Sequence, residues 1–410
     1  MNKIKKIELL APAGDFTRLK YALAYGADAV YLGLPEFSLR AKSGLNFATF
    51  KESVAYAHKL KKKVKKKVYV TVNIFAHEEH IKSLPKFLRQ LKDCQPDAII
   101  LSDPGVLMLV KNILPKMPIH LSTQANTLNS EAVKFWQKNG VKRIILGREV
   151  SLEDIKTIHK AVPKMELEVF VHGAMCMSYS GRCYLSKEFS NRNANLGACT
   201  QPCRWQYKLY AEEVTRPGRL FEIEEDSKGM YFMNSKDLCL VDYLDDLVKA
   251  GVLSFKIEGR TKSHYYVSSV VRAYREALDN LGDKKILADA KVELTKIDNR
   301  GYTTGFLIPI DPLKRQNFDS SKAQGDWQVA GEIVGEAGGM AEIKIHNSLS
   351  IDDNVEILTP RAVRKIKIKE ILNKTGEKIT EAHGGTADTY FIKLPKGINT
   401  EWGMLRKKKM

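Results

Sequence analysis

Four of the six cysteines of this chain fall within a short stretch, at Cys176, Cys183, Cys199 and Cys203. Four thiolates that share one loop region can hold a soft metal ion or an iron–sulfur cluster. Structural zinc sites usually pair their cysteines as C-x2–4-C, and only the second pair here has that spacing. The spacing therefore favours an iron–sulfur cluster over zinc. Four unrelated buried cysteines are the plain alternative, and Cys239 is a rival fourth ligand.

A second group of candidates consists of side chains that follow predicted strands and could carry positive charge: Arg148, His172, Lys256 and Arg260. Guanidinium and ammonium groups pair with carboxylates, so together these residues could bind an anionic small molecule. The alternative is that they form structural ion pairs, with Lys256 paired to Glu258 and Arg148 to a neighbour of Glu149. The first interpretation predicts a binding site for an organic anion.

Eight short apolar runs would position these residues. They are rich in Val, Ile and Leu and do not alternate cleanly, as is typical of strands buried on both faces. Stretches with apolar residues at three- and four-residue steps lie between them. Eight such units predict a (β/α)8 TIM-like barrel, with the candidate residues at its carboxyl-terminal mouth. A doubly wound sheet is the alternative, because periodicity does not show closure. The runs are Ile7–Ala11, Ala29–Leu34, Val68–Ile74, Ala98–Ser102, Ile119–Ser122, Arg143–Gly147, Leu167–Val171 and Leu253–Ile257.

The rest of the chain departs from this pattern in two places. Residues 174–235 hold the cysteines in a polar stretch, which we interpret as an insertion after the seventh strand. From residue 327 onward, short strand-like runs alternate with Gly-, Asn- and Asp-rich turns, which predicts a small antiparallel β-barrel. The predicted domains are thus a catalytic barrel over 1–310, a linker over 311–326 and a C-terminal β-barrel over 327–410.

The composition is that of a globular protein with an excess of positive charge. The 410 residues carry a formal charge of +18, which attracts polyanions such as nucleic acid, although a solvated lysine-rich surface is an equal alternative. No apolar run approaches the roughly 20 residues that span a bilayer. The basic start of the chain is followed by too short an apolar stretch for a secretory signal. We therefore expect a cytoplasmic protein without disulfides.

Several common catalytic signatures are absent from the sequence. His77-Glu78-Glu79-His80 lacks the spacing of the H-E-x-x-H zinc proteases. There is no G-x-S-x-G elbow, no P-loop and no dinucleotide fingerprint after a strand. The sequence therefore gives no support for the catalytic classes that these signatures mark.

The segment HGAMCMSYSGRCYLS, His172 to Ser186, resembles the signature of peptidase family U32, long labelled collagenase-like. The resemblance extends over nearly the whole chain, through the segments ELLAPAG, GADAVYLG, SDPG, HLSTQAN, GREVSLEDI, CTQPCRW, MNSKDLC, KIEGRTKS and NRGYTTGF in that order. Within the family, the chain is most similar to the prephenate-dependent enzymes that hydroxylate the wobble uridine of tRNA to 5-hydroxyuridine. Related members hydroxylate a ribosomal RNA cytidine or a ubiquinone precursor.

The resemblance implies a 4Fe–4S cluster, a barrel domain and a small C-terminal β-barrel. It also implies prephenate as co-substrate and tRNA as partner. Cys176, Cys183, Cys199 and Cys203 match the cluster cysteines of the family, while some relatives use a cysteine at the position of Cys239. Two other functions stay open: a peptidase, and a non-catalytic protein that binds RNA or carries a cluster. The sequence shows no nucleophile–base pair that would support the peptidase.

Overall fold

The computed structural model describes most of the chain, and all statements below concern the residues that it describes. These are residues 7–39, 45–60, 65–176, 178–179, 181–205, 207, 209–212, 214–215, 217–218, 220–223, 235–317, 323–385, 388–395, 397–398 and 400–409. Parts of the predicted insertion over 174–235, and the lysine-rich residues 61–64, lie outside the described residues.

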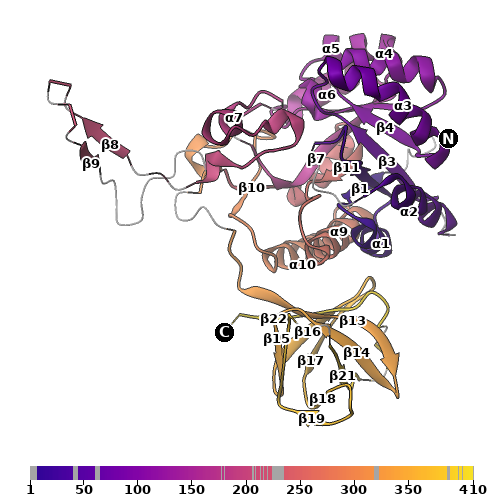
Figure 1. Cartoon of the computed structure of the whole chain (residues 1–410), viewed down its shortest axis with the longest axis vertical. Helices are drawn as coiled ribbons and strands as arrows, with labels where there is room; N and C mark the ends of the chain where they lie inside the picture. Colours follow the sequence, from indigo (N-terminus) through magenta and orange to yellow (C-terminus); the bar gives the residue numbers. More distant parts are fainter. Residues whose placement is uncertain are drawn as a thin grey trace. The chain divides into compact units, whose positions relative to one another are not determined.

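Eight parallel strands form a closed barrel (Figure 1). Their order is β11-β1-β2-β3-β4-β5-β6-β7, and β11 pairs in parallel with both β1 and β7, which closes the sheet. This confirms the predicted TIM-like barrel and excludes the doubly wound alternative. The strands are β1 (Glu8–Pro12), β2 (Ala29–Gly33), β3 (Lys67–Val72), β4 (Ala98–Leu101), β5 (Ile119–Leu121), β6 (Arg143–Ile145), β7 (Glu166–Ala174) and β11 (Val252–Ile257).

Helices follow the strands along the chain, and their ends carry the expected signals. Ser151 and Asp154 form a capping box at the start of α6, and Asp103 accepts a hydrogen bond from Val106 N at the start of α4. Gly140 follows α5 with φ +85°, a left-handed conformation that suits glycine at a helix end. The helices are α1 (Phe16–Ala24), α2 (Phe47–Lys59), α3 (Glu78–Cys94), α4 (Pro104–Ile113), α5 (Ser130–Lys138), α6 (Leu152–Ala161) and α9 (His264–Asp279).

The segment between β7 and β11 carries the cysteines. It contains α7 (Leu185–Ser190), two 3-10 turns at Ala194–Leu196 and Pro202–Arg204, and the hairpin β8 (Leu209–Glu212) and β9 (Leu220–Ile223). Strand β10 (Asp237–Cys239) then runs antiparallel to β7, and β12 (Tyr302–Thr303) pairs with β10. A further 3-10 turn at Val241–Tyr243 and helix α8 (Leu244–Lys249) lead into β11.

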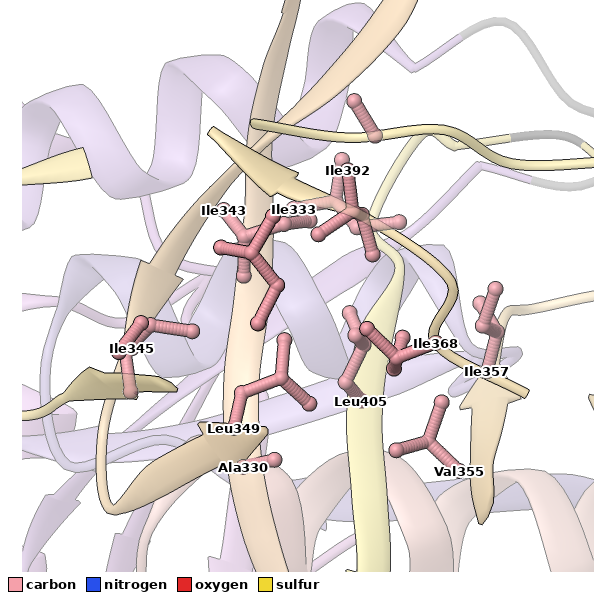
Figure 2. Close-up of a cluster of buried hydrophobic side chains, with 13 residues drawn as sticks. Ala330, Ile333, Ile343, Ile345, Leu349, Val355, Ile357, Ile368, Ile392 and Leu405 are labelled. Carbon is pink, nitrogen blue, oxygen red and sulfur yellow. The ribbon is translucent and has the colours of Figure 1, made fainter. Parts of the chain in front are cut away.

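The C-terminal region is an antiparallel sheet of eight strands in the order β17-β16-β22-β13-β14-β21-β18-β19. Figure 2 shows its interior, where Ile333, Ile343, Ile357 and Leu405 meet in a cluster of buried aliphatic side chains. The strands are β13 (Trp327–Ala337), β14 (Met340–Ile345), β16 (Asn354–Leu358), β17 (Val363–Lys367), β18 (Ile371–Leu372), β19 (Lys378–Ile379), β21 (Thr389–Ile392) and β22 (Met404–Lys408), with a separate ribbon of β15 (Ser348–Ser350) and β20 (Glu381–His383).

The chain divides into two compact units. The first comprises residues 1–16, 28–261 and 299–323, and the second comprises residues 17–27, 262–298 and 324–410. The second unit thus includes α1, α9 and the helix α10 (Lys284–Thr295), which the sequence analysis did not predict. The predicted domain boundary over 311–326 stays a prediction. In the part of the chain that the structure describes, no helix has both the length and the apolar character needed to cross a membrane.

Candidate functional site

A cavity of about 540 Å³ lies in the first unit, where the barrel strands end and the cysteine-bearing segment begins. The barrel contributes aromatic, polar and charged side chains, and the segment after β7 contributes all four clustered cysteines. Such a position at the carboxyl ends of the strands is the usual place for chemistry in this fold. The main barrel residues that line it are Tyr31, Asn73, Ser122, Arg148, Phe170, Lys256 and Arg260.

The four cysteines reach this cavity from separate short elements. Cys176 lies two residues after β7, and Cys183 precedes α7. Cys199 precedes the 3-10 turn at Pro202–Arg204, and Cys203 lies within that turn. Gly181 allows this loop to lie close to Phe75, because a Cβ at this position would lie 2.6 Å from a ring carbon of Phe75. The structure thus brings together the four residues that form the sequence cluster.

Hydrogen bonds from neighbouring residues fix the loops that carry the thiols. The Ser186 hydroxyl donates to Cys199 Sγ at 3.7 Å and accepts from Thr200 N at 3.0 Å. The Arg204 guanidinium donates to Met175 O at 3.1 Å and to Gln201 Oε1 at 2.7 Å. These contacts join the loop after β7 to the 3-10 turn, so they restrict where the sulfur atoms can lie.

The spacing of the thiols distinguishes between the metal groups that they could hold. Two thiolates on one tetrahedral zinc ion would stand about 3.8 Å apart. Within the described residues, no three of these sulfurs come within 4.8 Å of one another. Burial raises the pKa of the Cys203 thiol, and the thiols of Cys176, Cys183 and Cys199 are near enough to raise it further. The thiols are thus not spaced as the ligands of one zinc ion would be, and four thiols that line one cavity are a donor set that an iron–sulfur cluster takes.

Cys239 lies elsewhere in the first unit. It is on β10, directly opposite His172 on β7. Burial raises the pKa of the nearby Tyr302 phenol, and Cys239 is close enough to raise it further. Neither Cys239 nor His172 belongs to the described residues that line the cavity. The His172 side chain is buried, with its ring 5.5 Å from that of Tyr302. The described cavity lining therefore includes the other seven candidates but not these two.

Three of the four predicted cationic residues line the cavity together, each held by partners of its own. Arg148 lies 3.9 Å from the centre of the Phe170 ring and 3.5 Å from a Glu258 carboxylate oxygen. Arg260 donates to the hydroxyls of Ser38 at 2.6 Å and of Thr71 at 3.0 Å. These hydroxyl partners hold the Arg260 guanidinium at the wall of the cavity.

Lys256 is the deepest of the three cations. Its ammonium group lies 3.0 Å from Glu168 and 4.4 Å from the centre of the Tyr31 ring. Burial lowers its pKa, although the Glu168 carboxylate opposes this effect. The expected structural pair of Lys256 therefore exists, but the partner is Glu168 on β7 and not Glu258.

A buried ion network continues from Lys256 into the barrel, and the sequence analysis missed it. Arg143 lies 3.2 Å from Glu168 and also contacts Glu8. Glu8 further accepts hydrogen bonds from Tyr69 at 2.8 Å and Ser254 at 3.0 Å. The available signal was the charge of these residues within apolar strand runs, because buried charges need partners. We name the set Glu8, Arg143, Glu168 and Lys256 the barrel network.

The cysteine-bearing segment also exposes an unusual number of aromatic side chains. Tyr179, Tyr184, Phe189 and Trp205 are each more than 40% exposed, and the Phe189 ring lies 6.3 Å from Trp205 and 5.9 Å from Tyr207. Exposed basic residues accompany them at Arg182, Lys187 and Arg192. Aromatic faces beside positive charges are typical of surfaces that bind single-stranded nucleic acid.

This fold and its thiol-lined cavity agree with the family that the sequence motifs indicated. The chain matches the family model of peptidase family U32 over residues 14–317 and that of the peptidase family U32 C-terminal domain over residues 325–406. It therefore belongs to peptidase family U32.

Among its relatives are two proteins named tRNA hydroxylation protein P. The one from Haemophilus influenzae is 39% identical over 98% of this chain and 96% of its own length. The one from Escherichia coli is 38% identical over the same shares of both chains. A third relative, the 23S rRNA 5-hydroxycytidine C2501 synthase of Escherichia coli, is 32% identical over 91% of this chain and 55% of its own length.

Proposed function

We propose that this protein is an RNA-modifying enzyme that hydroxylates the wobble uridine of tRNA at C5, with a 4Fe–4S cluster as cofactor and prephenate as co-substrate. The observation that carries the proposal is that four thiols and three cations line one cavity at the mouth of the barrel. Near full-length similarity to two proteins named for tRNA hydroxylation supports the substrate class. Hydroxylation of ribosomal RNA is the second candidate, since one relative is named for it.

Each group of residues has a part in this proposal. Cys176, Cys183, Cys199 and Cys203 would hold the cluster, and the chemistry that a bound iron–sulfur cluster supplies is electron transfer. Arg148, Lys256 and Arg260 would bind the carboxylates of a small organic dianion such as prephenate. Because Phe170 and Tyr31 form part of the same wall, the ring of such a compound would find aromatic contacts there.

The RNA would approach over the cysteine-bearing segment. A base in a loop of tRNA is already unpaired, so it can enter a cavity at little cost in stacking and pairing energy. The exposed aromatic rings of Tyr184, Phe189 and Trp205 would stack on neighbouring bases. The excess of Lys and Arg would attract the phosphates. A tRNA substrate agrees with the predicted cytoplasmic location, which stays a prediction.

The test compares single cysteine variants produced from the chromosomal locus. We expect Cys176→Ser and Cys183→Ser to abolish 5-hydroxyuridine in digested tRNA, measured by nucleoside mass spectrometry. The anaerobically purified variants should also lose the broad absorption near 400 nm and their iron. Cys94→Ala is the matched control, because Cys94 is buried on α3 and does not line the cavity.

Cys203→Ser and Cys239→Ser together decide the fourth ligand. The proposal expects loss of iron from the first variant and retention in the second. Normal 5-hydroxyuridine in the Cys176→Ser strain, with no second enzyme that makes it, would contradict the proposed function. A colourless wild-type protein that holds one zinc ion would contradict the cluster.

A further inference from the structure

Two histidines and a glutamate meet in the second unit, apart from any residue used above. His264 Nε2 lies 3.0 Å from one carboxylate oxygen of Glu332, and His346 Nε2 lies 3.5 Å from the other. One ligand atom from each of the three residues lies within 4.8 Å of the others. Among the described residues, this is the one group of three His, Cys, Asp or Glu side chains that meets this criterion.

The local structure explains how the three residues come together. Glu332 on β13 pairs with Lys344 on β14, so His346, two residues further, lies diagonally opposite on the same face. His264 is the first residue of α9, where the Ser263 side chain caps the helix by accepting from Tyr266 N. Three separate elements thus deliver one side chain each to a common point.

The distances leave the three side chains close enough to share a metal ion. Ligands of tetrahedral zinc at 2.0–2.1 Å stand about 3.3 Å from one another, and the two observed distances of 3.0 and 3.5 Å lie on either side of this value. Both Nε2 atoms are buried, yet neither has a hydrogen bond of acceptable geometry. The ring nitrogens are therefore close to the carboxylate without pointing directly at it.

The surroundings prepare the carboxylate for this role. The Tyr21 hydroxyl donates to Glu332 Oε2 at 3.2 Å, as outer partners of metal-bound carboxylates commonly do. The three side chains are 13–27% exposed, so solvent reaches part of each of them.

We propose that His264, Glu332 and His346 form a binding site for a divalent zinc ion, with the fourth coordination position open to water. Two imidazoles and one carboxylate are a ligand set that zinc takes in proteins. Bound zinc would tie the start of α9 to β13 and β14. The site is independent of the cysteines, of the cavity and of the proposed RNA chemistry.

The test titrates the full-length, chelator-treated protein with ZnCl2 against a chromophoric chelator. The wild type should bind one more zinc ion per chain than His346→Gln or Glu332→Gln. The cysteines contribute equally to all these proteins, so only the difference counts. His383→Gln is the matched control, because His383 also lies near a glutamate, at 3.5 Å from Glu381, but its side chain is 69% exposed. Equal zinc binding by wild type and His346→Gln would overturn the proposal.

A second measurement does not depend on any variant folding. Crystals of wild-type protein soaked in ZnCl2 should show an anomalous peak at the zinc edge between the two Nε2 atoms and the carboxylate.

Thermal unfolding is a third measurement. Zinc at tenfold excess over its dissociation constant should raise the melting temperature of wild type and His383→Gln but not of His346→Gln. A zinc peak at the cysteines with none at this group would show that the three side chains form only an ion-pair cluster.

Discussion

The molecule holds two buried ion networks of similar composition. In the barrel network, Arg143 lies between Glu8 and Glu168, and Lys256 completes the set. In the second unit, Arg406 contacts Glu293 and Glu356 at 2.7 Å each, and Lys296 contacts the same two carboxylates at 2.8 and 2.9 Å. We name the latter set, Glu293, Lys296, Glu356 and Arg406, the sheet network.

The difference lies in what the two networks adjoin. Lys256 opens onto the thiol-lined cavity, whereas the sheet network joins α10 to β16 and β22. Desolvating ions costs several kcal/mol per group, so neither network is explained by stability alone. The comparison suggests that one network positions a charge for binding while the other fixes a helix on a sheet. The same residue types serve different purposes because of what surrounds them.

A matched pair of lysine variants tests whether the two networks differ in function. We expect Lys256→Met to lower tRNA hydroxylation about 10- to 100-fold, the loss for one charged hydrogen bond. Lys296→Met should leave the activity per folded molecule unchanged. Both variants should lose about 3 kcal/mol in the free energy of unfolding, because each leaves buried carboxylates with one cation fewer.

A double variant in the barrel network distinguishes a binding role of Lys256 from a purely structural one. Lys256→Met with Glu168→Gln should regain stability in urea unfolding, since no carboxylate is left without its lysine, but its activity should stay as low as that of Lys256→Met. Recovery of activity in the double variant would mean that Lys256 is only a structural partner of Glu168.

Adjacent residues on β22 sharpen the comparison inside the second unit. Leu405 belongs to the aliphatic core shown in Figure 2, while Arg406 faces the sheet network. We expect Leu405→Ala to cost about 2–5 kcal/mol through a cavity, and Arg406→Met to cost about 3–5 kcal/mol because two buried glutamates keep only Lys296 as a cationic partner. Both values come from denaturant unfolding. A cost below about 1 kcal/mol for Arg406→Met would show that the sheet network is dispensable.

Acid titration tests the barrel network through Glu8. Burial alone would raise the pKa of Glu8, but the contact with Arg143 outweighs it and lowers the pKa from 4.5 to about 2. A lowered pKa in the folded state stabilises the protein above the unfolded pKa, and the contribution disappears as the pH falls from about 4.5 to about 2.

Unfolding at a series of pH values measures this contribution. Wild type should lose about 3 kcal/mol more than Glu8→Gln over this acid range, because folding lowers the pKa of Glu8 from 4.5 to about 2. The control is Glu153→Gln, because the Glu153 carboxylate lies in a largely exposed pair with Lys156. This variant should lose as much unfolding free energy over the acid range as wild type. An identical acid dependence of the unfolding free energy in wild type and Glu8→Gln would rule out the assigned role of Glu8.

The smallest expected effect extends the comparison from buried charges to exposed aromatic rings. Trp205→Ala should weaken binding of a tRNA anticodon loop by about 1–3 kcal/mol, the value of one base–aromatic stack, with little change in stability. Phe135→Ala is the control, because Phe135 on α5 is 55% exposed but lies outside the cysteine-bearing segment. Equal affinities of the two variants in fluorescence anisotropy would remove this surface from the RNA-binding model.

The sequence by itself determined the barrel strands and the cysteine set. All eight predicted apolar runs overlap the observed strands, because buried parallel strands need continuous apolar residues and these are visible locally. The clustered cysteines and the strand-end cations Arg148, Lys256 and Arg260 line one cavity, whereas His172 is not among its described lining residues. Helix α10 was missed, since its apolar periodicity is weak and only Ala290 and Leu294 are buried.

Only the tertiary structure decided which distant residues meet. Glu8 and Arg143 are 135 positions apart, and their contact depends on closure of the barrel. The same holds for His264, Glu332 and His346, which three different elements bring together. Pairing of β10 with β7 placed Cys239 opposite His172 and away from the cavity. Strand and helix periodicities are local properties of the chain, whereas the partner of a buried charge or of a metal ligand is set by strand order and register, which no local pattern contains.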